Sequence, residues 1–193
     1  MRIRLPNHAT GLLLALLCSA SVSAAQNAHL AEKTAQSMIG LAFTSPIQGE
    51  PIPGHPTCIS TSEMRVFKDG EDLPDRSVTH ARCGGRDILM LQVETGKSPN
   101  LWSRYLVVDT LLLPRLSRND WPIPVKAPRL EDMSNCELDG SRDTLFFAVV
   151  RWGRRERVTG RTGVLHAWGF DENHRRIVPL DTSRIVCWRP EPD

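Results

Sequence analysis

The sequence lacks the short motifs that identify common hydrolases and metal sites. It has no G-x-S-x-G nucleophile turn and no H-E-x-x-H zinc motif. No two cysteines are spaced as C-x-x-C, the close pairing that structural zinc sites use. An acidic cluster at residues 69–75 does not have the spacing of a calcium-binding loop. We therefore predict no metal and no cofactor, and we assign no catalytic residue.

The chain also lacks an apolar run long enough to cross a membrane. Residues 11–18 are apolar but fall well short of the roughly 20 residues that a spanning helix needs. Arg2 and Arg4 precede this run and small residues follow it up to Ala25. The pattern is that of a secretory signal peptide over residues 1–25, cut after Ala24 or Ala25. We predict a periplasmic or secreted protein without a membrane span in its mature form.

The mature chain carries no excess of either charge. Removing residues 1–25 lowers Lys+Arg from 24 to 22, since Arg2 and Arg4 are lost, and leaves Asp+Glu at 22. A near-neutral chain has no global field to attract nucleic acid, so we predict no nucleic-acid partner. The remaining residues, about 168, suffice for one sizeable core, and one domain is the default.

Four cysteines remain after the predicted cleavage. An even number in an exported chain favours disulfides, although four cysteines allow three pairings. We favour Cys58–Cys83 and Cys136–Cys187 because each of these bonds would close one half of the chain.

Short apolar runs separated by turn residues predict a mainly β fold of antiparallel or mixed strands. We expect one disulfide-stabilised domain with a short N-terminal helix. The run at 86–94 is apolar on both faces, which is typical of a central strand, and residues 96–100 form a hairpin turn after it. The expected strands are residues 78–83, 86–94, 102–112, 144–152, 162–170 and 183–188.

Residues 26–57 are expected to hold a helix and a proline-rich linker before the β-rich domain of residues 58–193. Apolar residues recur at helical spacing over about 28–41, although a frayed N-terminus is the alternative. The density of prolines in residues 44–56 argues against a helix or a central strand there. Residues 68–75 have the composition of a turn.

The β-rich domain divides into two halves, residues 58–113 and 135–188, which show a faint sequence echo. A duplicated β-unit would give this pattern, and so would two ordinary hairpins. A second proline-rich stretch, residues 114–128, separates the halves and is the expected hinge.

One turn in the second half is unusually rich in arginine. Arginine guanidinium groups recognise carboxylates and phosphates, and tryptophan offers an apolar anchor, so this turn is a candidate contact surface. The alternative is a solvated hairpin loop that keeps a strand pair soluble. The candidate binding residues are Arg151, Trp152, Arg154, Arg155, Arg157 and Arg161.

These features favour an exported, non-catalytic binding or accessory protein of the cell envelope that engages a protein or polymer partner. An inhibitor or immunity-type protein would fit this class. The alternative is a secreted hydrolase with an unfamiliar site that uses His80 or His166 with a nearby Asp or Ser. A lone histidine in a strand is more often structural than catalytic.

Overall fold

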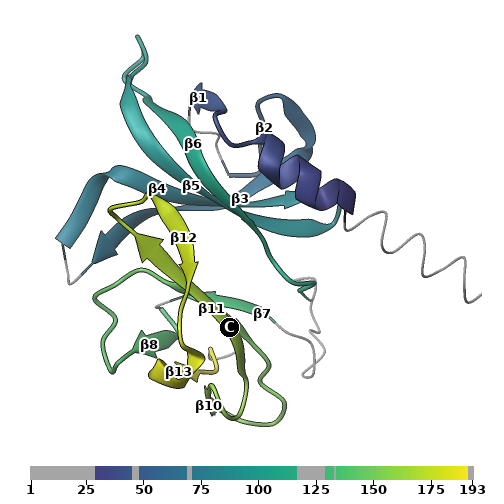
Figure 1. Cartoon of the computed structure of the whole chain (residues 1–193), viewed down its shortest axis with the longest axis vertical. Coiled ribbons are helices and arrows are strands. Elements are labelled where there is room, and N and C mark those ends of the chain that lie inside the picture. Colours follow the sequence, from purple (N-terminus) through teal and green to yellow (C-terminus); the bar gives the residue numbers. More distant parts are fainter. Residues whose placement is uncertain (1–28, 45–47, 69–70, 117–128, 133, 191–193) are drawn as a thin grey trace, which may run out of the picture.

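The computed structural model describes residues 29–44, 48–68, 71–116, 129–132 and 134–190 (Figure 1). The predicted leader and most of the predicted hinge lie outside these ranges. The described chain is mainly β with antiparallel sheets and one short helix, as the sequence predicts. Among the described residues, no helix is both long and apolar enough to cross a bilayer.

A six-stranded antiparallel sheet forms the larger part of the molecule. Its order is β1-β6-β5-β4-β3-β2, so β3 to β6 make a meander. β5 lies inside the sheet and is buried from Asp87 to Val93, which confirms the predicted central strand. The strands are β1 (Ala42–Thr44), β2 (Pro51–Ile52), β3 (His55–Lys68), β4 (Glu71–Cys83), β5 (Arg86–Lys97) and β6 (Ser103–Leu112).

Two smaller sheets lie together below the large one in Figure 1. A four-stranded sheet has the order β12-β11-β9-β7, and a three-stranded sheet has the order β10-β13-β8. Their strands are β7 (Arg129–Asp132), β8 (Cys136–Leu138), β9 (Phe147–Val150), β10 (Arg157–Thr159), β11 (Val164–Asp171), β12 (Arg176–Pro179) and β13 (Ile185–Trp188), with the 3-10 turn Thr182–Arg184 before β13.

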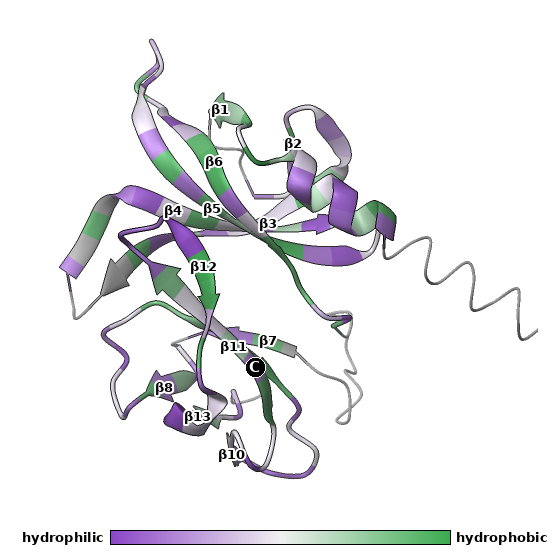
Figure 2. Cartoon of the chain, viewed as in Figure 1, coloured by the Kyte–Doolittle hydropathy of each residue, from purple (hydrophilic) through white to green (hydrophobic). Residues whose placement is uncertain are grey.

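Three apolar clusters hold these layers together. The first packs the helical segment 29–37 and its following turn against the large sheet, through Met38 and Met90 among others. The second, which includes Phe146, fills the space among the smaller strands. The third joins the large sheet to the four-stranded sheet through Leu89 and Phe147. Because successive side chains of an extended chain point to opposite faces, Phe146 and Phe147 serve different clusters. Figure 2 shows hydrophobic and hydrophilic segments alternating along the strands.

Both predicted disulfides are present. Cys58 and Cys83 face each other across β3 and β4, and Cys136 and Cys187 face each other across β8 and β13. All four cysteines are buried within the apolar clusters. Each bond therefore fixes one strand register as well as closing a loop.

The six expected strands correspond to β4, β5, β6, β9, β11 and β13. The helix occupies residues 29–37 of the described chain and gives way to a turn before the predicted end at 41.

Two segments expected to be irregular contain strands. The linker prediction is wrong over Pro51–Ile52 and His55–Pro56, which belong to β2 and β3, and the turn prediction is wrong over Glu71–Asp75, which opens β4. β2 is an edge strand, where proline can lack its N–H without losing a ladder bond, and the β2–β3 register is irregular beside Pro56. β3, with 14 residues, is also absent from the expected strands. The other strands missing from the prediction are short: β1, β7, β8, β10 and β12.

Digestion of the oxidised mature protein without reduction should release one pair of linked peptides for each bridge, Cys58 with Cys83 and Cys136 with Cys187. The loops they close span 25 and 51 residues, and loop-closure entropy gives each bridge about 3.5–4 kcal/mol of stabilisation. Mass spectrometry checks the pairing. A crossed pair, or alkylation of any of these four thiols without a reductant, would contradict the structure.

Candidate functional site

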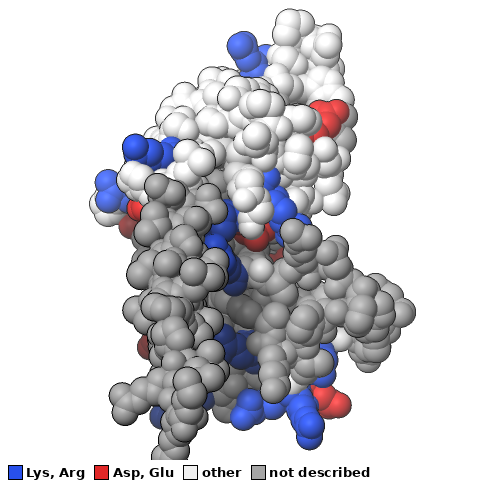
Figure 3. Space-filling model, turned by 90° about the vertical axis from the view of Figure 1, so that its right-hand side faces the viewer, with Lys and Arg blue, Asp and Glu red and all other residues white. Residues whose placement is uncertain are grey.

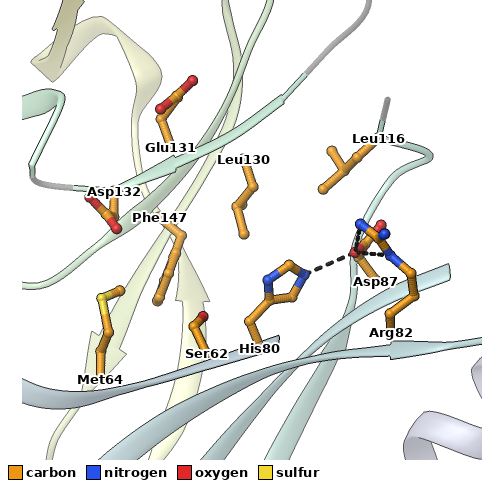
Figure 4. A pocket seen from close by; sticks show the side chains of 10 residues that line it. All are labelled: Ser62, Met64, His80, Arg82, Asp87, Leu116, Leu130, Glu131, Asp132 and Phe147. Carbon is orange, nitrogen blue, oxygen red and sulfur yellow. Dashed lines mark hydrogen bonds and ion pairs between the residues drawn. The ribbon is translucent and has the colours of Figure 1, made fainter. Parts of the chain in front are cut away.

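A polar pocket of about 160 Å³ lies where the large sheet meets the four-stranded sheet (Figure 4). Strands β3 to β5 supply one wall with Ser62, His80, Arg82 and Asp87. Strand β7 supplies carboxylates to the other. The pocket therefore combines side chains of the first half, residues 58–113, with carboxylates of β7, which precedes the second half, residues 135–188.

The tight turn between β4 and β5 places its polar side chains together. Gly84 and Gly85 have φ values of 55° and 79°, a left-handed pair that glycine adopts without steric cost. This turn sets Arg82 opposite Asp87, so His80, two residues earlier on the same face, is the diagonal neighbour of Asp87.

Asp87 is the centre of this wall. Its side chain is buried, and its Oδ1 atom lies 2.9 Å from His80 Nε2 and accepts hydrogen bonds from Arg82 Nε and Nη2, each at 3.3 Å. Burial raises the pKa of the Asp87 carboxyl, but the hydrogen bond and charge of His80, followed by those of Arg82, outweigh it. The net pKa lies below the ordinary value, so Asp87 is ionised at neutral pH.

The opposite wall is held by its own hydrogen bonds. Glu131 is buried and accepts from Trp152 Nε1 at 3.2 Å and from Asn135 Nδ2 at 3.0 Å. Asp132 Oδ1 accepts from the backbone N–H of Ser134 at 2.8 Å and from its hydroxyl. The two carboxylates thus organise the segment after β7 while lining the pocket.

Ser62 brings a hydroxyl to the same pocket. It faces His80 across the β3–β4 ladder, and Figure 4 shows it on the side of the imidazole away from Asp87. No hydrogen bond joins Ser62 Oγ to His80 in the described chain. The pocket gathers a histidine, a carboxylate and a hydroxyl, but it does not hold them as a hydrogen-bonded triad.

The other candidate histidine lies elsewhere. His166 is exposed on β11 and stacks on Trp168, with ring centroids 5.8 Å apart and an interplanar angle of 18°. It makes no ion pair within the described residues. Its position is that of a sheet-surface residue.

The arginine-rich turn lies at the far end of the smaller sheets. All five of its candidate arginines are exposed, and none forms an ion pair in the part of the chain that the structure describes. Arg155 Nη1 donates to the carbonyl of Thr162 at 3.2 Å, and the Arg157 guanidinium lies 5.9 Å from the ring centroid of Trp188.

Trp152 does not belong to that exposed surface. Its side chain is only 4% exposed and packs in the second apolar cluster, with its indole N–H bonded to Glu131. We therefore exclude Trp152 from the candidate contact surface, because a buried ring cannot anchor a partner.

Sequence reasoning missed Trp188 and Arg142 as neighbours of the turn. Arg142 lies 5.6 Å from the centroid of the Trp188 ring, so this ring has two guanidinium neighbours within cation–π range. Figure 3 shows Lys and Arg side chains gathered at the lower end of the molecule, where Figure 1 places β8, β10 and β13. We call this surface the arginine end; it comprises Arg142, Arg151, Arg154, Arg155, Arg157, Arg161 and Trp188.

Comparisons of the chain with protein-family models, with curated proteins and with solved structures found no match.

Replacing Asp87 with Asn should lower the free energy of unfolding by about 2–3 kcal/mol at neutral pH, because His80 and Arg82 lose a buried anionic acceptor. Folding lowers the pKa of Asp87. The contribution of this carboxylate to stability is therefore complete at pH values above its ordinary pKa of 3.8, and it is lost as the pH falls through the pKa of the folded state. Denaturant unfolding of wild type and variant over this range measures the difference.

The exposed Asp143→Asn is the matched control and should change stability by less than about 0.5 kcal/mol. Two results would contradict this view of the pocket. The wild type and Asp87→Asn could have the same free energy of unfolding at neutral pH, or their difference at neutral pH could persist unchanged in strong acid.

Proposed function

We propose that the protein is an exported, non-catalytic binding or accessory protein of the cell envelope, which engages an anionic protein or polymer partner through the arginine end. The observation that carries this proposal is that five exposed guanidinium groups of this surface have no ion-pair partner in the described chain, those of Arg151, Arg154, Arg155, Arg157 and Arg161. Residues 151–161 contain five arginines and only one acidic residue, Glu156. A partner that supplies carboxylates or phosphates would neutralise this local charge and accept its hydrogen bonds.

The backbone beneath these arginines is held in place. Arg151 N–H donates to the carbonyl of Gly163 at 2.8 Å, and Gly163 N–H donates to that of Thr159 at 2.9 Å. A Cβ atom at Gly163 would come within 2.5 Å of the Arg151 carbonyl, so glycine permits this close approach. β10 then pairs with β13, which the Cys136–Cys187 bond ties to β8. A fixed backbone reduces the entropy that binding costs.

Trp188 supports a recognition role for the same surface. It lies partly exposed on β13 within about 6 Å of two guanidinium groups, and tryptophan and arginine are among the residue types most enriched at the energetic centres of interfaces. Arg142 also pairs with Glu137 at 3.3 Å, which holds it beside the ring. The surface therefore offers an aromatic contact within a rim of positive charge.

Export is part of the proposal and has two supports. Residues 1–25 have the pattern of a signal peptide. Two disulfides between buried cysteines are typical of proteins that fold in oxidising compartments.

Changing Arg154, Arg155 and Arg157 together to Ser should abolish binding to an immobilised polyanion such as polyglutamate or heparin, while the thermal midpoint changes little. Exposed charges contribute about 0–1 kcal/mol to folding, whereas charge-dependent binding weakens as salt rises. Binding titrations at two salt concentrations, beside thermal melts, measure both effects.

The matched control changes three exposed basic residues elsewhere, Lys33, Arg115 and Arg176, to Ser. This variant should bind as the wild type does. Equal affinity of the wild type and the arginine-end variant would remove the arginine end from the proposal, and so would an equal loss in the control.

A hydrolase is the second candidate function, because the pocket holds a His80–Asp87 hydrogen bond and the Ser62 hydroxyl. In that role His80 would take a proton from Ser62 while Asp87 orients the imidazole. The His80 ring would have to move within hydrogen-bond distance of the Ser62 hydroxyl, because no hydrogen bond joins the two in the described chain.

If the pocket is catalytic, the mature protein should cleave a chromogenic ester, and Ser62→Ala or His80→Ala should each lower kcat/KM by a factor on the order of a thousand. Ser37→Ala, an exposed helix substitution, is the control. No turnover by the wild type, or turnover that survives Ser62→Ala, would argue against this second function.

A further inference from the structure

The hairpin between β5 and β6 ends in two neighbouring exposed apolar side chains. Leu101 is 80% exposed and Trp102 is 54% exposed, although both are large hydrophobic residues. Figure 1 shows this hairpin projecting from the upper end of the molecule. We call residues 97–104 the hairpin tip.

The tip extends beyond the last pair between β4 and β5, while β1 lies beside β6 only as far as Arg104. β4 pairs with β5 only as far as Val93, whereas β5 and β6 remain paired up to Lys97 and Ser103. The turn itself is closed by hydrogen bonds from Ser98 N to Trp102 O at 2.8 Å and from Leu101 N to Ser98 O at 2.9 Å. The two apolar side chains are thus presented on an ordered, convex ribbon.

Folding alone does not account for this arrangement. Leu101 has a φ of 65°, in the left-handed region that residues with a Cβ rarely adopt. Asparagine or glycine would fit that backbone with less strain, and a polar residue would hydrate better than leucine. A strained position that holds an apolar side chain in water points to a contact made outside the folded chain.

The charged residues within the tip are basic. Residues 95–104 contain two basic residues, Lys97 and Arg104, and no acidic residue. Lys97 pairs with Glu94 at 2.6 Å, just below the tip, while Arg104 is exposed and has no ion pair within the described ranges. In Figure 3 the uppermost part of the molecule is uncharged and a basic group stands beside it.

We propose that the hairpin tip docks the protein on a lipid bilayer, with Leu101 and Trp102 in the interfacial region and Arg104 among anionic headgroups. Tryptophan favours the membrane–water interface, where its ring is apolar and its N–H remains hydrated. Stable attachment of a peripheral protein needs an apolar and an electrostatic contribution together, and the tip offers both.

A lipid surface suits the shape of the tip better than a protein does. A stable protein interface covers about 800 Å² on each partner, and a convex tip with two apolar side chains supplies only part of that. A bilayer requires no complementary pocket, because lipids rearrange around an inserted side chain. The long axis of the molecule separates the tip from the arginine end (Figures 1 and 3), so docking leaves the arginine end directed away from the bilayer.

The test is co-sedimentation of the mature protein with vesicles of phosphatidylcholine alone and of phosphatidylcholine with phosphatidylglycerol. The wild type should partition onto the anionic vesicles. For the variant L101N/W102S, the partition coefficient onto these vesicles should be at least about tenfold lower than for the wild type, because the variant loses both apolar side chains. Its circular dichroism and thermal midpoint should match those of the wild type, since both positions are exposed.

Two controls identify the contacting surface. L30S/I39S removes two other exposed apolar side chains, 64% and 49% exposed, and should leave vesicle binding within about twofold of wild type. The variant with Arg154, Arg155 and Arg157 changed to Ser should also still bind vesicles.

Three outcomes would overturn the proposal. The wild type could fail to sediment with either kind of vesicle, and a protein partner would then be the better candidate for contact with the tip. The tip variant could sediment as well as the wild type. Vesicle binding could instead be lost in the arginine-end variant alone, in which case the membrane contact would belong to the opposite end of the molecule.

Discussion

The apolar layer between the large sheet and the four-stranded sheet is the contact on which the rest of the structure depends. Leu89 and Leu91 of β5 meet Phe147 of β9 in one buried cluster, and Phe147 packs edge to face on Phe170 at 6.2 Å. Each fully buried side chain of this size contributes about 1.5–3 kcal/mol. A carboxylate crosses the same boundary, since Asp109 of β6 accepts the N–H of Ile177 on β12 at 2.7 Å.

This layer explains where the polar features lie. The face of β4 that packs in it through Val78 continues, two residues at a time, to His80 and then Arg82. The polar pocket is therefore the edge of the apolar junction. The arginine end includes Arg157 of β10 and Trp188 of β13 in the three-stranded sheet, and the hairpin tip lies beyond the last pair between β4 and β5. Neither contributes to the apolar cluster at the junction. Their exposure is compatible with a well-packed core, and both are free to contact other molecules.

Sequence patterns identify the strongly apolar strands and little of the site. The run at 86–94 is buried on both faces, so its composition marks it as a central strand. β3 begins beside prolines and continues through Ser60–Glu63, which have no apolar periodicity to read. A hairpin centred on Gly84–Gly85 sets Arg82 opposite Asp87, and the two adjacent glycines are the signal that could have located this pair from the sequence.

Two other features, the Arg142–Trp188 contact and the burial of Trp152, depend on tertiary packing and could not be predicted from local sequence patterns. The contact of Arg142 with Trp188 follows from the way β8 and β13 pair. Trp152 is buried because other elements pack over it, and its position at the end of an apolar run does not reveal which elements do so.

The arginine end is the surface that we propose recognises an anionic partner. The most direct test of this proposal is NMR titration of the isotope-labelled mature protein with soluble polyglutamate. We expect the chemical-shift changes to concentrate on the side-chain Nε–H groups of Arg154, Arg155 and Arg157 and on the Trp188 indole. Changes confined to His80 and Asp87 in the pocket, or no changes at any position, would contradict it.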